Sequence, residues 1–280
     1  MPSLEDIILQ RDNRGISALR HLMEPSYLES TGRFVLDNKG PVVIVTGFFI
    51  VGAQASETDG PPGAVALGNV LSSLGYGLRY VTDSCSFDIV NGLSDKQHEV
   101  IEFPILNDIE SEKFAGDLIR KMMPSLLISI ERCGPSEDGK ARNMRNVDIT
   151  EFNAKTDYLF KDQIPSIGIG DGGNEIGMGN LRKAITSVPS LVEYPCVTEV
   201  SRLVIASVSN WGAYGLIAAI SRCLGENLLP SIKEEQRLVQ KSVDLGAVDG
   251  FTGQKLPMVD GFTMEQNSQT LRDLHDALKI

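Results

Sequence analysis

The chain has 280 residues, of which 42% are hydrophobic and 22% charged, and its formal net charge is -11 at pH 7. This length and apolar content suffice for one large α/β domain with a buried core. The charge argues against a nucleic-acid partner, because contact with a phosphate backbone requires clustered Lys and Arg. The same acidity is compatible with a pocket that holds a cation.

Cysteine and histidine usage excludes the common zinc and disulfide patterns. The four cysteines (85, 133, 196 and 223) form no C-x-x-C pair, and the three histidines (21, 98 and 275) are scattered. Any metal site is therefore expected to use oxygen ligands. The first residues carry no signal-peptide pattern, and the longest apolar run, 41–53, is too short to span a bilayer. These features predict a cytoplasmic protein without a membrane partner.

The apolar pattern predicts alternating strands and helices. Residues 1–35 are expected to form a helical lead-in, because apolar positions in 3–23 follow helical spacing. Strands are predicted at 42–46, 78–82, 99–103, 126–130, around Ile167 and Ile169, and at 202–207. Helices are predicted at 61–74, 86–93, 111–122, 213–224, 232–245 and 264–278, with one more running from the glycine-rich stretch through Ile185. This alternation indicates a three-layer, mostly parallel α/β sheet flanked by helices, and the lack of a linker or repeat predicts a single domain over 1–280.

The stretch 164–180, IPSIGIGDGGNEIGMGN, is the most distinctive in the chain. Its glycines at 168, 170 and 173 satisfy the G-x-G-x-x-G pattern of dinucleotide-binding loops. We reject that interpretation because the first glycine lies inside the predicted strand, and because Asp171 and Glu175 place negative charge where a phosphate would bind. A carboxylate among glycines at the end of a strand suits a hard cation or a polar substrate.

Carboxylates follow the predicted strands with unusual regularity: Glu57 and Asp59, Asp83, Glu131, and then Asp171 and Glu175. In parallel α/β sheets, ligands bind beyond the carboxyl ends of the strands, so these side chains are expected to converge. Convergent carboxylates repel one another unless a cation neutralises them. Mg²⁺, Mn²⁺ and Ca²⁺ all prefer oxygen ligands and are the candidates.

Several polar residues have a structural explanation as well as a functional one. Glu57 and Asp59 could cap the next helix, and Asp138 and Asp148 could form turns. Asn174 could be a turn residue, and Trp211 and Tyr214 could belong to the core. Arginines 132, 142 and 145 could be ion-pair partners, although an Arg beside an acidic cluster also suits a substrate carboxylate. Serine-hydrolase, P-loop and zinc-protease motifs are missing from the sequence.

Six motifs, in a consistent order over most of the chain, resemble those of the D-glutamate cyclase C-terminal domain family: TGFFI (46–50), ETDGPPGAVALG (57–68), ISIERCG (128–134), NMRNVDI (143–149), GIGDGGNEIGMGN (168–180) and SVSNWGAYGL (207–216). The resemblance implies a metal-binding α/β protein. It also implies a hydro-lyase that closes D-glutamate to 5-oxo-D-proline with loss of water.

That chemistry suggests roles for particular residues. We expect one or two divalent ions to be held by Glu57, Asp59, Glu131, Asp138 and Asp171. Catalytic roles are expected for Glu175 as base, for Asp171 and for Arg132, and substrate contacts for Thr58, Arg145, Asn174 and Asn210. A metal-dependent phosphatase or other hydrolase, or a metal-dependent binding protein without chemistry, remains an alternative. The expected partner is a small acid or amino acid, and a homo-oligomer is the base-rate expectation.

Overall fold

Six parallel strands form the central sheet, in the order β5-β4-β1-β6-β7-β8. The computed structural model describes residues 2–161 and 163–279. The strands are β1 (Pro41–Thr46), β4 (Gly77–Thr82), β5 (Glu99–Glu102), β6 (Leu126–Ile130), β7 (Ser166–Gly170) and β8 (Arg202–Ile205). In β6 and β7 every residue is buried, as expected for strands covered on both faces. The predicted three-layer parallel sheet is confirmed.

The direction in which the chain adds strands reverses between β1 and β6. From β1 the chain builds outward through β4 to β5, then returns to place β6, β7 and β8 on the other side of β1. At such a reversal the connections leave the two central strands in opposite directions and open a crevice at their carboxyl ends. The fold therefore places a binding crevice after β1 and β6.

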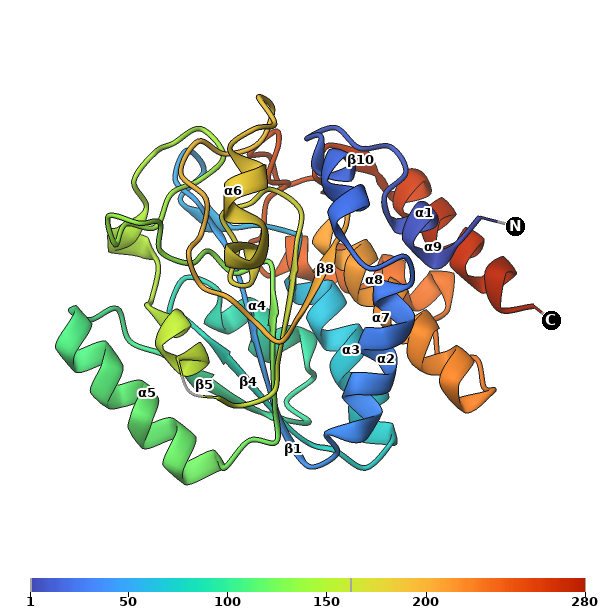
Figure 1. Cartoon of the computed structure of the whole chain (residues 1–280), viewed down its shortest axis with the longest axis horizontal. Coiled ribbons are helices and arrows are strands. Elements are labelled where there is room, and N and C mark those ends of the chain that lie inside the picture. The colour runs from blue at the N-terminus through green and yellow to red at the C-terminus, as the bar shows by residue number, and fades with distance from the viewer. Residues whose placement is uncertain (1, 162, 280) are drawn as a thin grey trace.

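Helices cover both faces of the sheet. Helices α3 (Pro61–Ser73) and α7 (Ser209–Leu224) pack together on one face, and α5 (Asp108–Met122) lies on the other (Figure 1). The two packed helices approach closely at Gly63, where an added Cβ would lie 2.9 Å from the Cα of Asn210. A larger residue at position 63 would force apart the helices that begin at the crevice.

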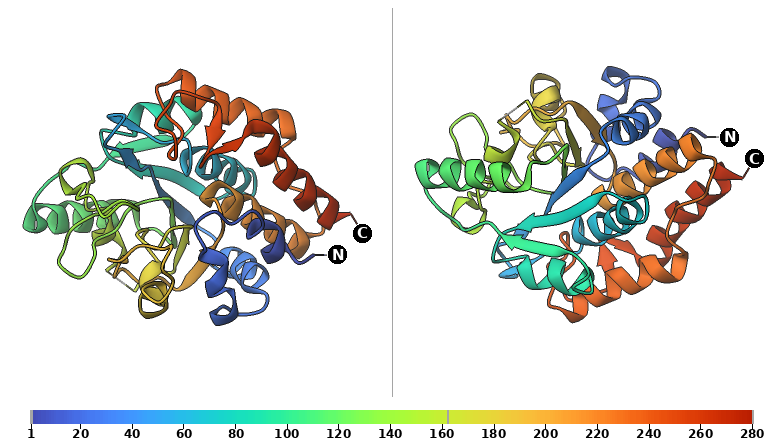
Figure 2. Two further views of the ribbon diagram at one scale, coloured as in Figure 1. Left: turned by 90° about the horizontal axis from the view of Figure 1, so that it is seen from above. Right: turned by 90° about the horizontal axis from the view of Figure 1, so that it is seen from below.

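The N-terminal segment is an integral part of the domain. It contains α1 (Leu4–Ile8), the 3-10 helix η1 (Ile16–Leu22) and α2 (Tyr27–Asp37). Helix α1 packs on α7 and on the C-terminal helix α9 (Met264–Leu278), so the two ends of the chain lie side by side (Figure 2). The amide of Ser207 donates to the carbonyl of Ile8 at 2.9 Å, which ties this segment to the end of β8. The segment expected as a helical lead-in thus contains helices and packs against α7 and α9.

Shorter elements complete the chain: β2 (Phe49–Ile50), β3 (Ala55–Ser56), α4 (Phe87–Leu93), η2 (Thr150–Phe152), η3 (Thr156–Phe160), η4 (Met178–Leu181), α6 (Arg182–Ile185), α8 (Ile232–Asp244), β9 (Met258–Val259) and β10 (Phe262–Thr263). The glycine-rich stretch forms a loop over 171–177 and then enters η4 and α6, so the predicted helical segment is present and ends at Ile185. Gly173 and Gly177 have φ of 104° and 107°, which an α-helix does not admit.

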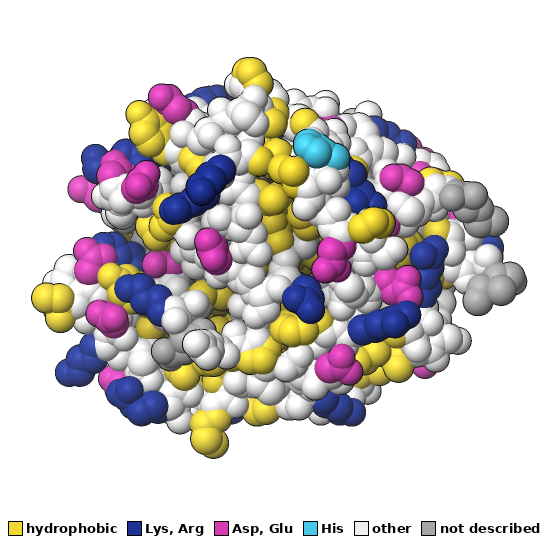
Figure 3. Space-filling model, viewed as in Figure 1, with side chains coloured by type: hydrophobic (Ala, Val, Ile, Leu, Met, Phe, Trp, Pro, Cys, Tyr) yellow, Lys and Arg dark blue, Asp and Glu magenta, His cyan; other side chains and the backbone are white. Residues whose placement is uncertain are grey.

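No helix within the described residues is long and apolar enough to cross a membrane. Acidic and basic side chains are interspersed on the face of the molecule shown in Figure 3. Part of the net negative charge is buried instead, in carboxylates that are at most 4% exposed. The position of these buried carboxylates in the fold therefore determines the chemistry that the chain can support.

Candidate functional site

Six buried carboxylates gather at the crevice between β1 and β6. Two follow the β2–β3 hairpin after β1, one follows β6, two lie in the loop after β7, and the last is in the β9–β10 turn: Glu57, Asp59, Glu131, Asp171, Glu175 and Asp260. One carboxylate oxygen from each of Asp59, Asp171 and Asp260 lies within 4.8 Å of the others, and the same holds for Glu131, Asp171 and Glu175. Asp171 belongs to both groups and is the centre of this acidic cluster.

Arg14 enters the cluster from the loop between α1 and η1. Its Nη1 pairs with Asp171, and its Nη2 lies 2.7 Å from Oδ1 of Asp260. Burial would lower the pKa of Arg14, but the surrounding carboxylates outweigh it and hold that pKa well above its ordinary value. The Arg14 guanidinium therefore lies within the cluster of six carboxyl groups.

Four of the carboxyl groups have a raised pKa because they are buried together: Glu57, Asp59, Glu131 and Asp171. Burial, followed by repulsion between neighbours, raises the pKa of Glu57 and Glu131 well above the ordinary value and that of Asp59 to about 7. The pKa of Asp171 is also raised by burial, although Arg14 opposes the shift. A cluster with these properties gains stability from any additional positive charge.

The oxygens of the cluster suit a hard divalent cation. Asp171 Oδ2, Asp260 Oδ2 and Asn174 Oδ1 are buried and accept no hydrogen bond from the described part of the chain. Buried polar atoms without partners are costly unless another group, such as an ion, satisfies them. The donor set contains only oxygen, which fits Mg²⁺, Mn²⁺ or Ca²⁺ better than a softer metal.

Two of the carboxylates are fixed by the start of helix α7. The oxygens of Asp59 accept from the amides of Ser209 and Asn210, each at 2.8 Å, and Glu131 Oε2 accepts from the Ser209 hydroxyl at 2.6 Å. Glu131 and Asp260 also adopt positive φ, 45° and 52°, which non-glycine residues seldom do. Such backbone conformations are concentrated at functional sites.

Glu175 has both oxygens occupied. They accept from the amides of Asp171, Gly172 and Gly173 at 3.2, 2.7 and 2.7 Å, and the side chain is fully buried. These bonds fold the glycine-rich loop around the carboxylate. The expected role of Glu175 as base remains a prediction, and these hydrogen bonds favour a contribution to holding Asp171 in place.

Arg132 and Asp138 lie apart from the acidic cluster. The Arg132 guanidinium is buried, lies 2.5 Å from Asp83 and donates to three further protein oxygens. It is therefore unavailable to a substrate. Asp138 is exposed, and its contact with Arg142 lowers its pKa. A catalytic Arg132 and a metal ligand at Asp138 therefore remain predictions that these contacts do not favour.

Thr58 and Asn210 contact the protein and not the crevice. The Thr58 hydroxyl donates to the carbonyl of Met258 at 2.6 Å. The side-chain oxygen Oδ1 of Asn210 accepts from the backbone amides of Gly60 and Gly63, at 3.1 and 2.7 Å, and its side-chain nitrogen Nδ2 donates to the carbonyl of Thr58. These hydrogen bonds hold the segment that carries Asp59 against helix α7, and the expected substrate contacts of Thr58 and Asn210 remain predictions that this geometry does not favour.

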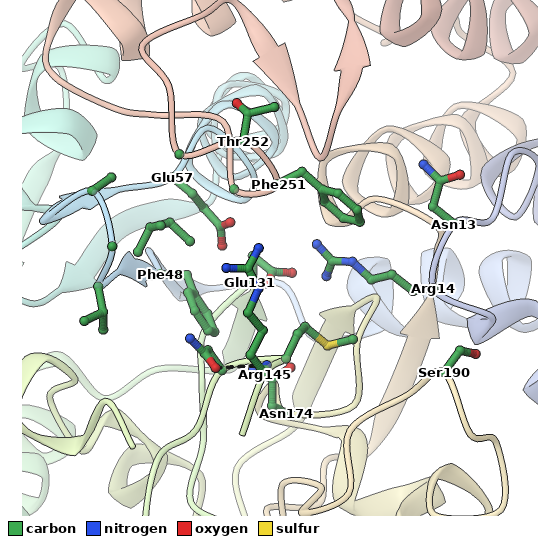
Figure 4. Close-up of a pocket in the computed structure, with 18 residues that line it drawn as sticks. Asn13, Arg14, Phe48, Glu57, Glu131, Arg145, Asn174, Ser190, Phe251 and Thr252 are labelled. Atoms are coloured by element: carbon green, nitrogen blue, oxygen red, sulfur yellow. Dashed lines mark hydrogen bonds between the residues drawn. The ribbon is translucent and has the colours of Figure 1, made fainter. Parts of the chain in front are cut away.

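A cavity of about 450 Å³ opens onto the cluster, and Glu57 and Glu131 lie in its wall. Figure 4 shows the side chains of Glu57 and Glu131 pointing toward the region where the head groups of Arg14 and Arg145 lie, with the Phe251 ring between Glu57 and Arg14. Asn174 and Arg145 both line it, and Arg145 is exposed with its backbone amide bonded to Asn143. The sites of Arg145 and Asn174 are thus compatible with substrate contact.

Sequence reasoning missed Arg14, Asp260 and the loop 250–253. In the segment 246–262 the glycines are the feature of the sequence that points to the site. Gly250 allows the backbone to approach Glu57, because an added Cβ there would lie 2.1 Å from Oε2 of Glu57. For Arg14 the signal is Asp12, which accepts from the amides of Arg14, Gly15 and Ser17. A loop bound this tightly holds the next side chain in a fixed place.

Fold and site together define a doubly wound α/β protein with a buried acidic cluster beside a pocket at the point where strand order reverses. The chain belongs to the D-glutamate cyclase-like, C-terminal family, whose model matches residues 4–275. The mitochondrial D-glutamate cyclase of Homo sapiens is 31% identical over 305 residues, covering 92% of this chain and 48% of that protein. The chain thus spans about half the length of this relative.

Among solved structures, the crystal structure of RecJ in complex with Mn²⁺ from Thermus thermophilus matches with a TM-score of 0.39 and 11% sequence identity. The match covers 81% of this chain and 25% of that one. Structural similarity at this TM-score gives no information about the site.

Proposed function

We propose that the chain is a D-glutamate cyclase-like hydro-lyase that closes D-glutamate to 5-oxo-D-proline and depends on a divalent cation. Membership of the family and 31% identity with human D-glutamate cyclase support the reaction. The observation that carries the proposal is that a cavity of about 450 Å³ opens onto a buried acidic cluster whose oxygens are not all hydrogen-bonded within the described residues. Such a pocket accommodates an amino acid beside a cation.

The reaction makes three demands on the site. The amine nitrogen attacks the side-chain carboxylate carbon, so a C–N bond forms, a C–O bond breaks and the oxygen departs as water. The negative charge on that carboxylate must be offset before attack. The ammonium must give up two protons in the course of the reaction, the first to a base before attack, and the leaving oxygen must receive two to depart as water.

Four carboxylates are proposed as cation ligands: Asp59, Glu131, Asp171 and Asp260. When bound, the cation supplies positive charge that makes the substrate carboxylate a better electrophile. The N-terminus of α7 fixes Asp59 and Glu131, and the bonds from the loop amides to Glu175 hold Asp171 in place. The protein thus keeps the ligands in position before the ion arrives.

Glu57 is the proposed base. It lines the cavity, and burial raises its pKa well above the ordinary value, which makes it a stronger base than an exposed carboxylate. Arg145 is proposed to bind the carboxylate that does not react, and the free Asn174 Oδ1 to accept from the substrate ammonium. Phe48 and Phe251 in the wall limit access of water around the reacting atoms.

The direct test is to incubate the purified protein with D- and L-glutamate, with Mg²⁺ or Mn²⁺, and to follow 5-oxoproline by chiral chromatography. We expect product from D-glutamate only when a metal is present. Glu57→Gln should abolish turnover while Mn²⁺ still raises the melting temperature, because the four ligands remain. No product from either enantiomer with metal would refute the proposal, and hydrolysis of an aryl phosphate in its place would favour the phosphatase alternative.

A further inference from the structure

Arg14 lies in the place that a divalent ion would be expected to take. We propose that its guanidinium is a tethered cation that competes with the divalent ion for Asp171 and Asp260, so that metal binding requires Arg14 to leave them. This inference rests on the metal site of the proposed function and adds a residue that controls occupancy of that site.

The backbone around Arg14 is fixed. Asp12 accepts from the amides of Arg14, Gly15 and Ser17 at 3.1, 2.7 and 2.8 Å. Gly15 has φ of 91°, and an added Cβ would lie 2.3 Å from the Ser190 hydroxyl. The loop therefore fixes the position of the Arg14 backbone, whereas the long side chain can still rotate about its own bonds.

The contacts of Arg14 match those of a small cation bridging two carboxylates. One nitrogen pairs with Asp171 and another lies 2.7 Å from Asp260. Yet Asp171 Oδ2 and Asp260 Oδ2 accept no hydrogen bond within the described chain, so the guanidinium satisfies this pair only in part. A divalent ion carries twice the charge and contacts more oxygens, so it can displace a guanidinium that is held in this way.

A second position for Arg14 lies next to the first. Its side chain already lines the cavity, and its guanidinium carbon lies 5.4 Å from the centre of the Phe251 ring. Released from Asp171 and Asp260, the guanidinium can stay against Phe251 and face the cavity. There it would offer a second positive group to a substrate carboxylate, so that the metal binds before the substrate.

The test measures Mn²⁺ affinity in the absence of substrate, by counting free Mn²⁺ with electron paramagnetic resonance. We expect Arg14→Gln to bind Mn²⁺ about tenfold more tightly or better, as follows if Arg14 leaves only about a tenth of the wild-type molecules competent to bind. The matched control is Arg145→Gln, which removes the same charge from the same cavity without touching Asp171 or Asp260. Its affinity should change less than about threefold because an exposed charge is screened.

Two further measurements separate competition from general electrostatics. Millimolar methylguanidinium should weaken Mn²⁺ binding to Arg14→Ala and leave the wild type unchanged, since only the truncated variant has room for it. If Arg14→Gln does not fold, Arg14→Lys decides. The Lys side chain is shorter and lacks the planar fork that reaches Asp171 and Asp260 together, so this variant should bind Mn²⁺ more tightly than the wild type.

The outcomes distinguish this inference from the metal site itself. Tighter binding by Arg14→Gln together with competition by methylguanidinium supports the proposal. Equal or weaker binding by Arg14→Gln, while Asp171→Asn loses Mn²⁺, overturns the role of Arg14 and leaves the metal site intact. No Mn²⁺ binding by the wild type or by any Arg14 variant overturns both.

Discussion

Replacing Asp171 by Asn tests the acidic cluster most directly, because this residue belongs to both groups of converging oxygens and is fully buried. A ligand present at 100 times its dissociation constant stabilises a protein by about 2.7 kcal/mol. For a chain of this size that gain corresponds to a rise in melting temperature of roughly 5–10 °C. The amide of Asn brings one neutral oxygen in place of a carboxylate, so the variant should lose nearly all of this rise.

The assay is thermal unfolding with and without Mn²⁺, followed by circular dichroism. The control is Asp138→Asn, which removes one negative charge from an exposed position outside the cluster. This control should keep the full metal-dependent rise, and the metal-free melting curve of Asp171→Asn shows whether that variant is folded. An undiminished rise in a folded Asp171→Asn protein would refute the assignment of the cluster as the metal site.

Three further substitutions follow from the structure. Gly250→Ala should lower metal-dependent activity at least about tenfold in the chromatographic assay, because its Cβ would displace Glu57. The control Gly52→Ala should behave as wild type, since Gly52 lies in the same cavity wall and has open space around it. Arg145→Gln should raise KM for D-glutamate with less effect on kcat, and an unchanged KM would count against the substrate contact. Burial raises the pKa of Glu235 to about 7, so the free energy of unfolding of the wild type should fall as pH rises from about 4.5 to 7. Glu235→Gln should remove up to about 3 kcal/mol of that fall, measured by urea unfolding at pH 5 and 8. The same change of unfolding free energy with pH in the variant and the wild type would contradict this prediction.

The sheet could be predicted from the sequence because its strands are short, apolar and separated by helices with clear apolar faces. The run 42–46 is β-branched throughout, and β1 is buried from Val42 onward. The helical segment predicted to run through Ile185 is present as η4 and α6, and it starts only at Met178 because two glycines with positive φ keep 171–177 in a loop. Periodicity shows which segments are helical but not the φ of individual glycines.

The site was only partly predictable. Glu57, Asp59, Glu131 and Asp171 follow strands, so the rule that parallel strands end at one edge was enough to bring them together. Arg14 and Asp260 come from opposite ends of the chain, and only the packing of α1 and α9 on α7 brings their loops to the crevice. No local pattern encodes that contact, and the same is true of the ion pair that withdraws Arg132 from the site.

The crevice of this fold is the place where a doubly wound sheet commonly binds phosphates, and the structure shows why it suits a cation here. An anion needs free amides at the helix N-termini. The first amides of α7 are already bonded to Asp59, and Gly60 and Gly63 at the start of α3 donate to the side chain of Asn210. Because the protein's own side chains occupy both helix ends, the crevice offers an incoming ligand unpaired carboxylate oxygens in place of amides. The glycines after β7 therefore give backbone room to Asp171 and Glu175, and the sign of the charge at the crevice is the reverse of that in a phosphate-binding loop.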